Sequence, residues 1–222
     1  MGKDKLRRFE AIKSFENVHE HSLDHLSENK GFWNERVFKN SGKLILELGC
    51  GKGEYSVGLG ELYPDNNYIG VDLKGNRIYI GAKIALEKEL KNVAFLRTRI
   101  DFIDDYFGEN EVDEIWLTFS DPQPNKPRKR LTSTLFINRY RKFLKPTGLI
   151  HLKTDSELLY ESTLEEIASN NYCLIDNKPD LYAALATNEN RDEQAIFSIK
   201  THYENAFVKR GHTIKYCCFT IN

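Results

Sequence analysis

A glycine-rich turn between a short apolar run and a helix start constrains the fold of this 222-residue chain more than any other feature. The apolar run LILEL, at residues 44–48, is followed by GCGKG and then by the helix-like EYS. Gly49, Gly51 and Gly53 allow the backbone to turn tightly and to approach a ligand closely. In doubly wound α/β folds the ligand lies at this place, after the first strand and at the start of the first helix. The turn therefore predicts an α/β fold with a ligand site beside it.

Strand-like and helix-like patterns alternate along the rest of the chain. Further strands are expected at 67–73, 93–98, 114–120, 149–155, 172–177 and 213–221, and helices at 77–90, at 134–144 and up to about Asn170. Such alternation indicates a parallel sheet with helices on both faces. We therefore expect a mostly parallel, seven-stranded, Rossmann-like sheet. Residues 177–200 show no pattern that can be assigned.

Composition bounds the class of protein. The length suits one α/β domain, and a net charge of -1 means that any basic surface must be local. We interpret residues 1–40, which are charged and contain histidines, as an N-terminal extension, and residues 41–222 as a single domain. The four cysteines form no C-x-x-C, and His19, His21 and His25 fit no established metal motif. With no apolar run of membrane length, we expect a cytoplasmic protein without metal or membrane.

The residues around the glycine turn indicate the kind of ligand. Asp72 ends the next strand about 20 residues on, where an acid can bind ribose hydroxyls. A dinucleotide site shares this plan, but the third glycine of G-x-G-x-x-G is missing, and Glu47 would repel a pyrophosphate. S-adenosylmethionine has a sulfonium and an ammonium group and no phosphate. It therefore fits better, with Glu47 and the backbone near Gly49 at its amino-acid end, although a dinucleotide or a purely structural turn stays open.

A cationic, proline-rich loop follows the fourth predicted strand. Asp121 stands at the end of that strand, and the loop continues PQPNKPRKR. No acid occurs from Pro122 to Thr154, whereas that span holds nine basic residues: Lys126, Arg128, Lys129, Arg130, Arg139, Arg141, Lys142, Lys145 and Lys153. Such a block beside a ligand site favours a phosphate backbone as partner. The alternatives are a solvated basic face and, for Asp121, a turn-initiating Asp-Pro.

Five motifs occur in the order ELGCGKGEY, GVDLKGNRI, FSDPQP…KRL, LKTD and THYENAF…G. Together they resemble the bacterial tRNA (guanine-N7-)-methyltransferases over roughly residues 40–222. The resemblance implies a class I methyltransferase fold and S-adenosylmethionine as cofactor. It also implies transfer of a methyl group to N7 of a variable-loop guanine in tRNA.

The same resemblance implies roles for single residues. Cofactor binding falls to Glu47, Gly49, Gly51, Asp72, Arg99 and Asp121, and substrate binding to Asn125, Lys126, Asp155, Thr201 and Glu204. Asp121 matches the catalytic acid. The loop departs from the family pattern, since Gln123 stands where a Trp is usual and Asn125 stands where the first Lys would be. Lys126 could supply that charge.

The resemblance leaves several alternatives open. Tyr203 and Phe207 are candidates for stacking on the target base or for the core, and Thr201 with Glu204 has the spacing of a capping box. The basic stretch KDKLRR near the N-terminus could supplement the tRNA-binding surface. The partner is expected to be tRNA, with the protein a monomer or a homodimer. A methyltransferase for another RNA or a small molecule, and a non-catalytic RNA-binding protein, are the other functions considered.

Overall fold

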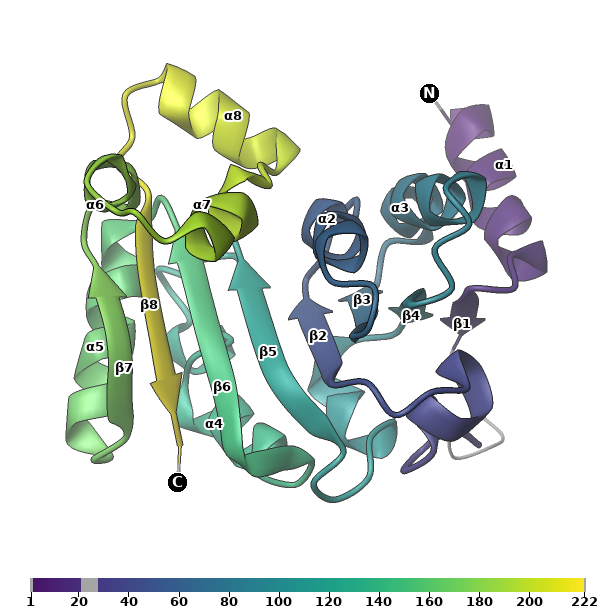
Figure 1. Cartoon of the computed structure of the whole chain (residues 1–222), viewed down its shortest axis with the longest axis horizontal. Helices are drawn as coiled ribbons and strands as arrows, with labels where there is room; N and C mark the ends of the chain where they lie inside the picture. Colours follow the sequence, from purple (N-terminus) through teal and green to yellow (C-terminus); the bar gives the residue numbers. More distant parts are fainter. Residues whose placement is uncertain (1, 21–27, 222) are drawn as a thin grey trace.

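The computed structural model describes residues 2–20 and 28–221 of the chain, which build one mixed β-sheet flanked by helices (Figure 1). The strands are β1 (Val18–Glu20), β2 (Leu44–Leu48), β3 (Asn67–Asp72), β4 (Val93–Arg97), β5 (Val112–Thr118), β6 (Leu144–Thr154), β7 (Cys173–Lys178) and β8 (Lys215–Thr220). Their order in the sheet is β1-β4-β3-β2-β5-β6-β8-β7. Neighbouring strands from β1 to β6 are parallel, and β8 is antiparallel to both β6 and β7.

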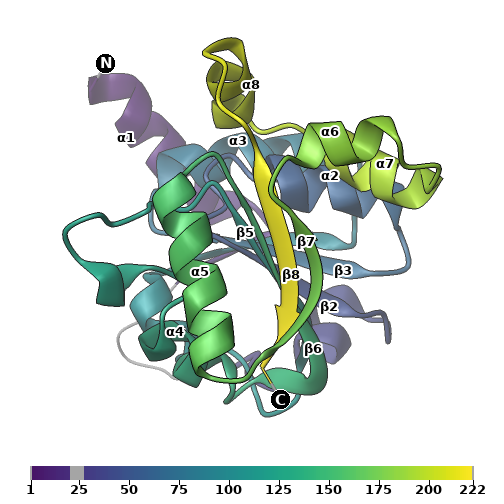
Figure 2. The same ribbon diagram turned by 90° about the vertical axis from the view of Figure 1, so that its left-hand side faces the viewer.

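Helices cover both faces of this sheet (Figure 2). The α-helices are α1 (Gly2–Ala11), α2 (Glu54–Leu62), α3 (Gly75–Glu87), α4 (Thr134–Tyr140), α5 (Glu157–Ser169), α6 (Leu181–Ala186), α7 (Arg191–Ser198) and α8 (His202–Lys209). The part of the chain that the structure describes also contains short 3₁₀ or π-helical segments: η1 (Ile12–Ser14), η2 (Trp33–Phe38), η3 (Ile100–Asp105) and η4 (Pro127–Lys129).

Alternation along the central strands divides the core into two clusters. In β2, Leu46 faces the cluster that includes α4 and α5, whereas Ile45 faces the cluster that includes α2, α3, α6 and α7. In β5 the same division separates Leu117 from Trp116. Successive side chains of a strand point to opposite faces, so these continuously apolar strands are buried on both sides. The expected sandwich of helices around a mostly parallel sheet is confirmed.

The expected number of strands was wrong, because the sheet has eight within residues 2–20 and 28–221. The additional strand, β1, comes from the segment before residue 40 and pairs in parallel with β4. It is short and half-buried, so it lacks the apolar alternation that marks a strand in a sequence. Several boundaries also differ by a few residues, and two differ most: α4 ends at Tyr140 rather than at residue 144, and β6 begins at Leu144 rather than at residue 149.

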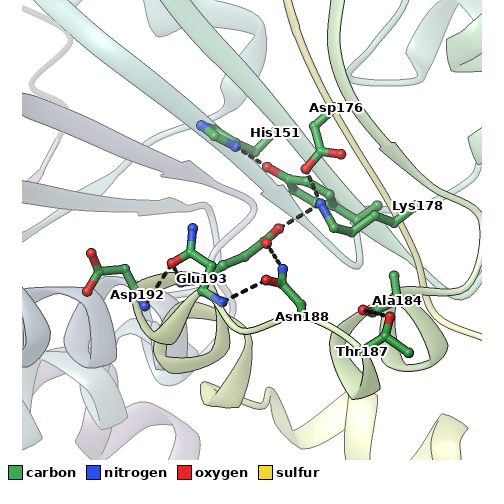
Figure 3. Close-up of polar contacts among 10 residues, drawn as sticks. His151, Asp176, Lys178, Ala184, Thr187, Asn188, Asp192 and Glu193 are labelled. Atoms are coloured by element: carbon green, nitrogen blue, oxygen red, sulfur yellow. Dashed lines mark hydrogen bonds and ion pairs between the residues drawn. The ribbon is translucent and has the colours of Figure 1, made fainter.

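The region without an assignable pattern, residues 177–200, holds α6 and α7, and charged groups join α7 to β7 (Figure 3). Lys178 Nζ lies 2.6 Å from Glu193 Oε1 of α7 and also pairs with Asp176. Asn188 donates a hydrogen bond to the same Glu193 carboxylate. Ion pairs between residues far apart in sequence produce no periodic pattern of apolar residues. The helices of this region could therefore not be predicted from the sequence.

Two features concern membrane and metal. Within residues 2–20 and 28–221, no helix combines the length and the apolar character needed to cross a membrane. In the same described part of the chain, no group of three or more His, Cys, Asp or Glu side chains is arranged to hold a metal ion. His19 lies in β1, whereas His21 and His25 fall outside the described residues.

Candidate active site

A cleft of about 970 Å³ opens where the parallel strands end. Residues at the ends of five strands, α8, the start of α3, the loop around η4 and α4 all line this cleft. The strand ends contribute Gly49 after β2, Asp72 at the end of β3, Thr98 to Asp101 after β4, Phe119 to Gln123 after β5, and Asp155 and Ser156 after β6. The other elements contribute Lys74 and Arg77, Lys126, Lys129, Leu131 and Phe136, and Tyr203 and Phe207 of α8. In open α/β sheets ligands bind at this edge. The sheet therefore gathers residues that are far apart in sequence.

The glycine turn forms one side of the cleft and is tied to the end of β3. The backbone N–H groups of Gly49 and Cys50 both donate to the carbonyl oxygen of Val71, at 2.8 and 3.0 Å. Asp72 Oδ2 accepts a hydrogen bond from Gly51 N at 3.0 Å. Gly53 has φ +71°, and a Cβ atom there would lie 2.4 Å from the Phe95 ring, so only glycine fits.

Glu47 is buried behind the glycine turn and does not line the cleft. The side chain is buried, and Oε2 accepts hydrogen bonds from Ser56 N at 2.9 Å and from Ser56 Oγ at 2.6 Å. Thr118 Oγ1 donates to the other carboxylate oxygen at 2.8 Å. Burial raises the pKa of Glu47 to about 7, although these hydrogen bonds oppose the shift. Glu47 thus joins β2, the first turn of α2 and the end of β5.

Asp121 lies on the opposite side of the cleft, in a sharply turned segment. Phe119 and Gln123 have φ values of +52° and +45°, in the left-handed region that side chains with a Cβ rarely adopt. Asp121 Oδ1 accepts a hydrogen bond from Gln123 N at 2.9 Å, which closes a turn of the Asx type. Asp121 therefore does initiate a turn, which was the structural alternative for the Asp-Pro pair. The same turn also places Asp121 in the cleft lining.

The expected substrate-binding acids have different surroundings. Asp155 lines the cleft, and its Oδ2 atom lies 3.5 Å from His212 Nδ1. Thr201 and Glu204 are buried and form a complete capping box at the start of α8. Glu204 Oε1 also lies 2.7 Å from Lys153 Nζ. Thr201 and Glu204 therefore have structural partners within the protein.

In the folded protein, acids neutralise much of the positive charge of the basic block, the nine basic residues between Pro122 and Thr154. Acids from elsewhere in the chain pair with five of its nine members: Asp101 with Lys129, Asp104 with Arg139 and Lys142, Asp113 with Lys145, and Glu204 with Lys153. Lys126, Arg128 and Arg130 have no carboxylate within ion-pair distance among the described residues. These three lie in the loop around η4, and Lys126 among them lines the cleft, together with Lys74, Arg77, Arg99 and Lys129.

The structure brings together six of the predicted site residues and leaves five outside the cleft lining. Inside are Gly49, Asp72, Arg99, Asp121, Lys126 and Asp155, and outside are Glu47, Gly51, Asn125, Thr201 and Glu204. Sequence reasoning missed Asp101, which lines the cleft between Arg99 and Lys129, at 3.1 and 2.9 Å. The hydrogen bond from Lys129 contributes most to lowering the pKa of Asp101. Asp101 stands two residues beyond Arg99, the residue that was predicted to contact the cofactor after this strand.

Comparison with known proteins places this arrangement in context. A family model described as a putative methyltransferase matches residues 41–217. A tRNA (guanine-N(7)-)-methyltransferase of Bacteroides thetaiotaomicron is 47% identical over an alignment that covers 100% of this chain and 87% of that protein. An enzyme of the same name from Christiangramia forsetii is 45% identical, with 99% and 98% of the two chains covered.

Solved structures with a similar fold are more distant in sequence. The 16S rRNA methyltransferase KamB has a TM-score of 0.63 at 13% identity, with 85% of this chain and 92% of that chain covered. The geranyl diphosphate C-methyltransferase of Streptomyces coelicolor, solved with S-adenosyl-L-homocysteine, has a TM-score of 0.52 at 17% identity. That alignment covers 84% of this chain and 72% of the other. At such identities the similarity establishes the fold.

Proposed function

The chain belongs to the tRNA (guanine-N(7)-)-methyltransferase family, and on that premise we propose that it transfers the methyl group of S-adenosylmethionine to N7 of a variable-loop guanine in tRNA. One structural observation carries the proposal: a single cleft joins two halves with different chemistry. Asp72 and the glycine turn bound one half, and Asp121 and Asp155 bound the other. A methyl donor and a methyl acceptor can therefore lie side by side.

The residues of the first half suit S-adenosylmethionine. Asp72 keeps a carboxylate at the rim, where ribose hydroxyls can donate to it, and its bonds to Gly51 N and Lys74 N hold it in place. Among the described residues, the lining carries four carboxylates, those of Asp72, Asp101, Asp121 and Asp155, and five basic side chains, those of Lys74, Arg77, Arg99, Lys126 and Lys129. Acids that can contact a cationic methyl donor and cations that can contact a phosphate backbone therefore line the same cleft. Buried Glu47 would act indirectly, by fixing the turn that meets the amino-acid end of the cofactor.

The chemistry of guanine sets what the protein must do. S-adenosylmethionine, when bound, supplies a methyl group on a positively charged sulfur. N7 of guanine has an exposed lone pair in the plane of the ring, so no proton has to be removed before it attacks. The protein therefore needs to align N7 with the methyl carbon and the sulfur, and such positioning can account for much of the rate acceleration.

Asp121 is placed to orient the base and to stabilise its developing charge. One of its oxygens is engaged by Gln123 N, so the other can accept hydrogen bonds from the N1–H and N2 amino groups of guanine. Positive charge moves from the sulfur to the purine during transfer. A fixed carboxylate beside the purine favours that movement electrostatically. Asp155, held near His212, could share the contact with the base edge.

The test is a transfer assay with labelled S-adenosylmethionine and unmodified tRNA transcripts, followed by mapping of 7-methylguanine through chemical strand cleavage. We expect the label at a single guanine of the variable loop. Cofactor binding without transfer to any tRNA would refute the proposal. Label on ribosomal RNA or on a small molecule, but not on tRNA, would instead identify a different methyl acceptor.

A further inference from the structure

Helix α8 lies over the carboxyl ends of β5 and β6, above the half of the cleft that holds Asp121 and Asp155 (Figure 1). Contacts with several elements fix it there. His202 N donates to Glu54 Oε1 of α2 at 3.2 Å, and the Arg77 guanidinium of α3 lies 5.8 Å from the centre of the Tyr203 ring. These two contacts join α8 to α2 and to α3 beside the cleft.

The face of α8 that looks into the cleft is aromatic. Tyr203 and Phe207 both line the cleft and are four residues apart, so they share one side of the helix. Their ring centres are 6.5 Å apart with planes inclined by 23°, and the Phe207 ring lies 6.1 Å from that of Phe119. Tyr203 is the outermost ring of this series, with 44% of its surface exposed.

A buried ion pair holds an adjacent side of the same helix, because Glu204 is turned about 100° around the helix axis from Tyr203. Lys153 of β6 and Glu204 of α8 both have fully buried side chains, and Lys153 Nζ lies 2.7 Å from Glu204 Oε1. The Tyr55 hydroxyl accepts a second hydrogen bond from Lys153 at 2.8 Å, and the Tyr182 hydroxyl donates to Glu204. Glu204 directly follows Tyr203, so anchoring Glu204 inward sets the rotation of α8 about its axis. That rotation decides where Tyr203 points.

We propose that Tyr203 stacks on the target guanine and that the buried Lys153–Glu204 pair is the positioning device that holds α8 in the orientation for this contact. The inference rests on the function proposed above and adds to it the residue that receives the base. An aromatic ring suits this reaction in particular. Stacking holds the base, and the face of the ring attracts the positive charge that the purine gains.

The first test compares Tyr203→Ala with Tyr203→Phe, and uses Phe32→Ala as a matched control. Phe32 is equally exposed, at 46%, and does not line the cleft. We expect Tyr203→Ala to raise KM for tRNA about tenfold, which is the size of one lost base–aromatic stack. Tyr203→Phe keeps the ring and should retain most of the affinity, and Phe32→Ala should behave as the wild type. The Kd for S-adenosylmethionine should stay within about twofold in all three.

The second test addresses the ion pair. Removing one partner alone would leave a buried charge and could unfold the chain, so the double variant Lys153→Met/Glu204→Leu replaces both charges with apolar groups of similar size. We expect this variant to fold, as judged by its circular dichroism, and to show a raised KM for tRNA. Adding Tyr203→Ala to it should then raise KM little further, because Tyr203 has already lost its orientation.

The outcomes separate the inference from the function on which it rests. If the wild-type protein methylates tRNA and Tyr203→Ala has an unchanged KM, the stacking role is wrong. If the effects of the double variant and of Tyr203→Ala are independent and multiply, the ion pair does not act through Tyr203. If the wild-type protein transfers no methyl group to tRNA, it is the proposed function that fails.

Discussion

At the scale of single residues, backbone strain surrounds Asp121, the residue for which we propose a catalytic role. Phe119 and Gln123, on either side of it, adopt left-handed backbone angles, each of which costs about 1–2 kcal/mol for a residue with a side chain. Such conformations persist where the surrounding structure imposes them, often at functional sites. Here they turn the chain sharply out of β5 and keep Asp121 at the cleft instead of continuing the strand.

Replacing Asp121 by Asn tests the proposed role of its charge. The amide oxygen can still accept the hydrogen bond from Gln123 N, so the turn should survive. The negative charge is lost, however, and the amide nitrogen would meet the donor edge of guanine. We expect kcat to fall about 100-fold, with the Kd for S-adenosylmethionine little changed. Single-turnover methylation and equilibrium cofactor binding would measure the two effects, and a kcat like that of the wild type would rule out the role.

Glu47 gives a prediction about pH and stability. Its pKa is raised from 4.5 to about 7 by burial, so the folded protein retains a proton that the unfolded chain has already released. The free energy of unfolding should therefore fall as the pH rises from about 4.5 to about 7, by roughly 3 kcal/mol from this residue. In Glu47→Gln this component should vanish. Urea titrations of both proteins between pH 4 and pH 8 would show it as a widening stability difference, and a constant difference would contradict it.

At the scale of elements, the loop around η4 combines positively charged side chains with a rigid backbone. Its prolines, Pro122, Pro124 and Pro127, restrict the backbone, and Arg130 Nε donates to the carbonyl oxygen of Pro122 at 2.9 Å. Lys126 lies in the cleft lining, and η4 holds Lys129 against Asp101. The loop therefore presents its unpaired cations from a fixed frame, as expected of a surface that receives a phosphate backbone.

The salt dependence of tRNA binding should reveal which basic side chains of this region contact tRNA phosphates. Lys126→Ala should lower the slope of log KM for tRNA against log salt by about one, because one phosphate contact is lost. Lys142→Ala is the matched control, since this lysine is exposed but lies 2.6 Å from Asp104. It should leave the slope unchanged. Equal slopes for Lys126→Ala and the wild type would exclude a phosphate contact at Lys126.

Elements with a strong local pattern were predictable, and those that depend on distant partners were not. The strand LILEL, the glycine turn and the acid ending β3 could be identified because each carries its own signal. β1 could not, because its pairing with β4 makes it a strand. The same holds for the cleft. The positions of Asp72 and Asp121 in its lining could be predicted because both residues follow or end a strand. The pairing of the basic block with Asp101, Asp104 and Asp113 exists only in the folded chain.

At the scale of the whole molecule, the N-terminal segment is joined to the sheet. α1 and η1 pack on α3, and Ile12 has no exposed surface. Phe95 N of β4 donates to the carbonyl oxygen of Asn17 at 2.8 Å, next to β1. Residues before position 20 thus contribute both core packing and a strand to the structure that carries the site.

Ile12→Ala should consequently destabilise the entire molecule. The loss of a fully buried isoleucine costs about 2–5 kcal/mol in folded cores. Leu6→Ala on α1 serves as a control, because 62% of Leu6 is exposed and its truncation should cost less than about 0.5 kcal/mol. Chemical denaturation of both variants would measure the difference. If Ile12→Ala were as stable as Leu6→Ala, the packing of the N-terminal segment would contribute nothing to global stability.

The position of β8 also affects the order in which the protein can fold during its synthesis on the ribosome. β8 lies between β6 and β7, although it follows both of them, and α6 to α8, in the chain. The half of the sheet that carries the glycine turn can therefore assemble while synthesis continues, whereas β7 has to wait for β8 before it joins. Helix α8 directly precedes β8 in the chain, so it also takes its place late in synthesis. A nascent chain could therefore bind the methyl donor before the site for the target base has formed.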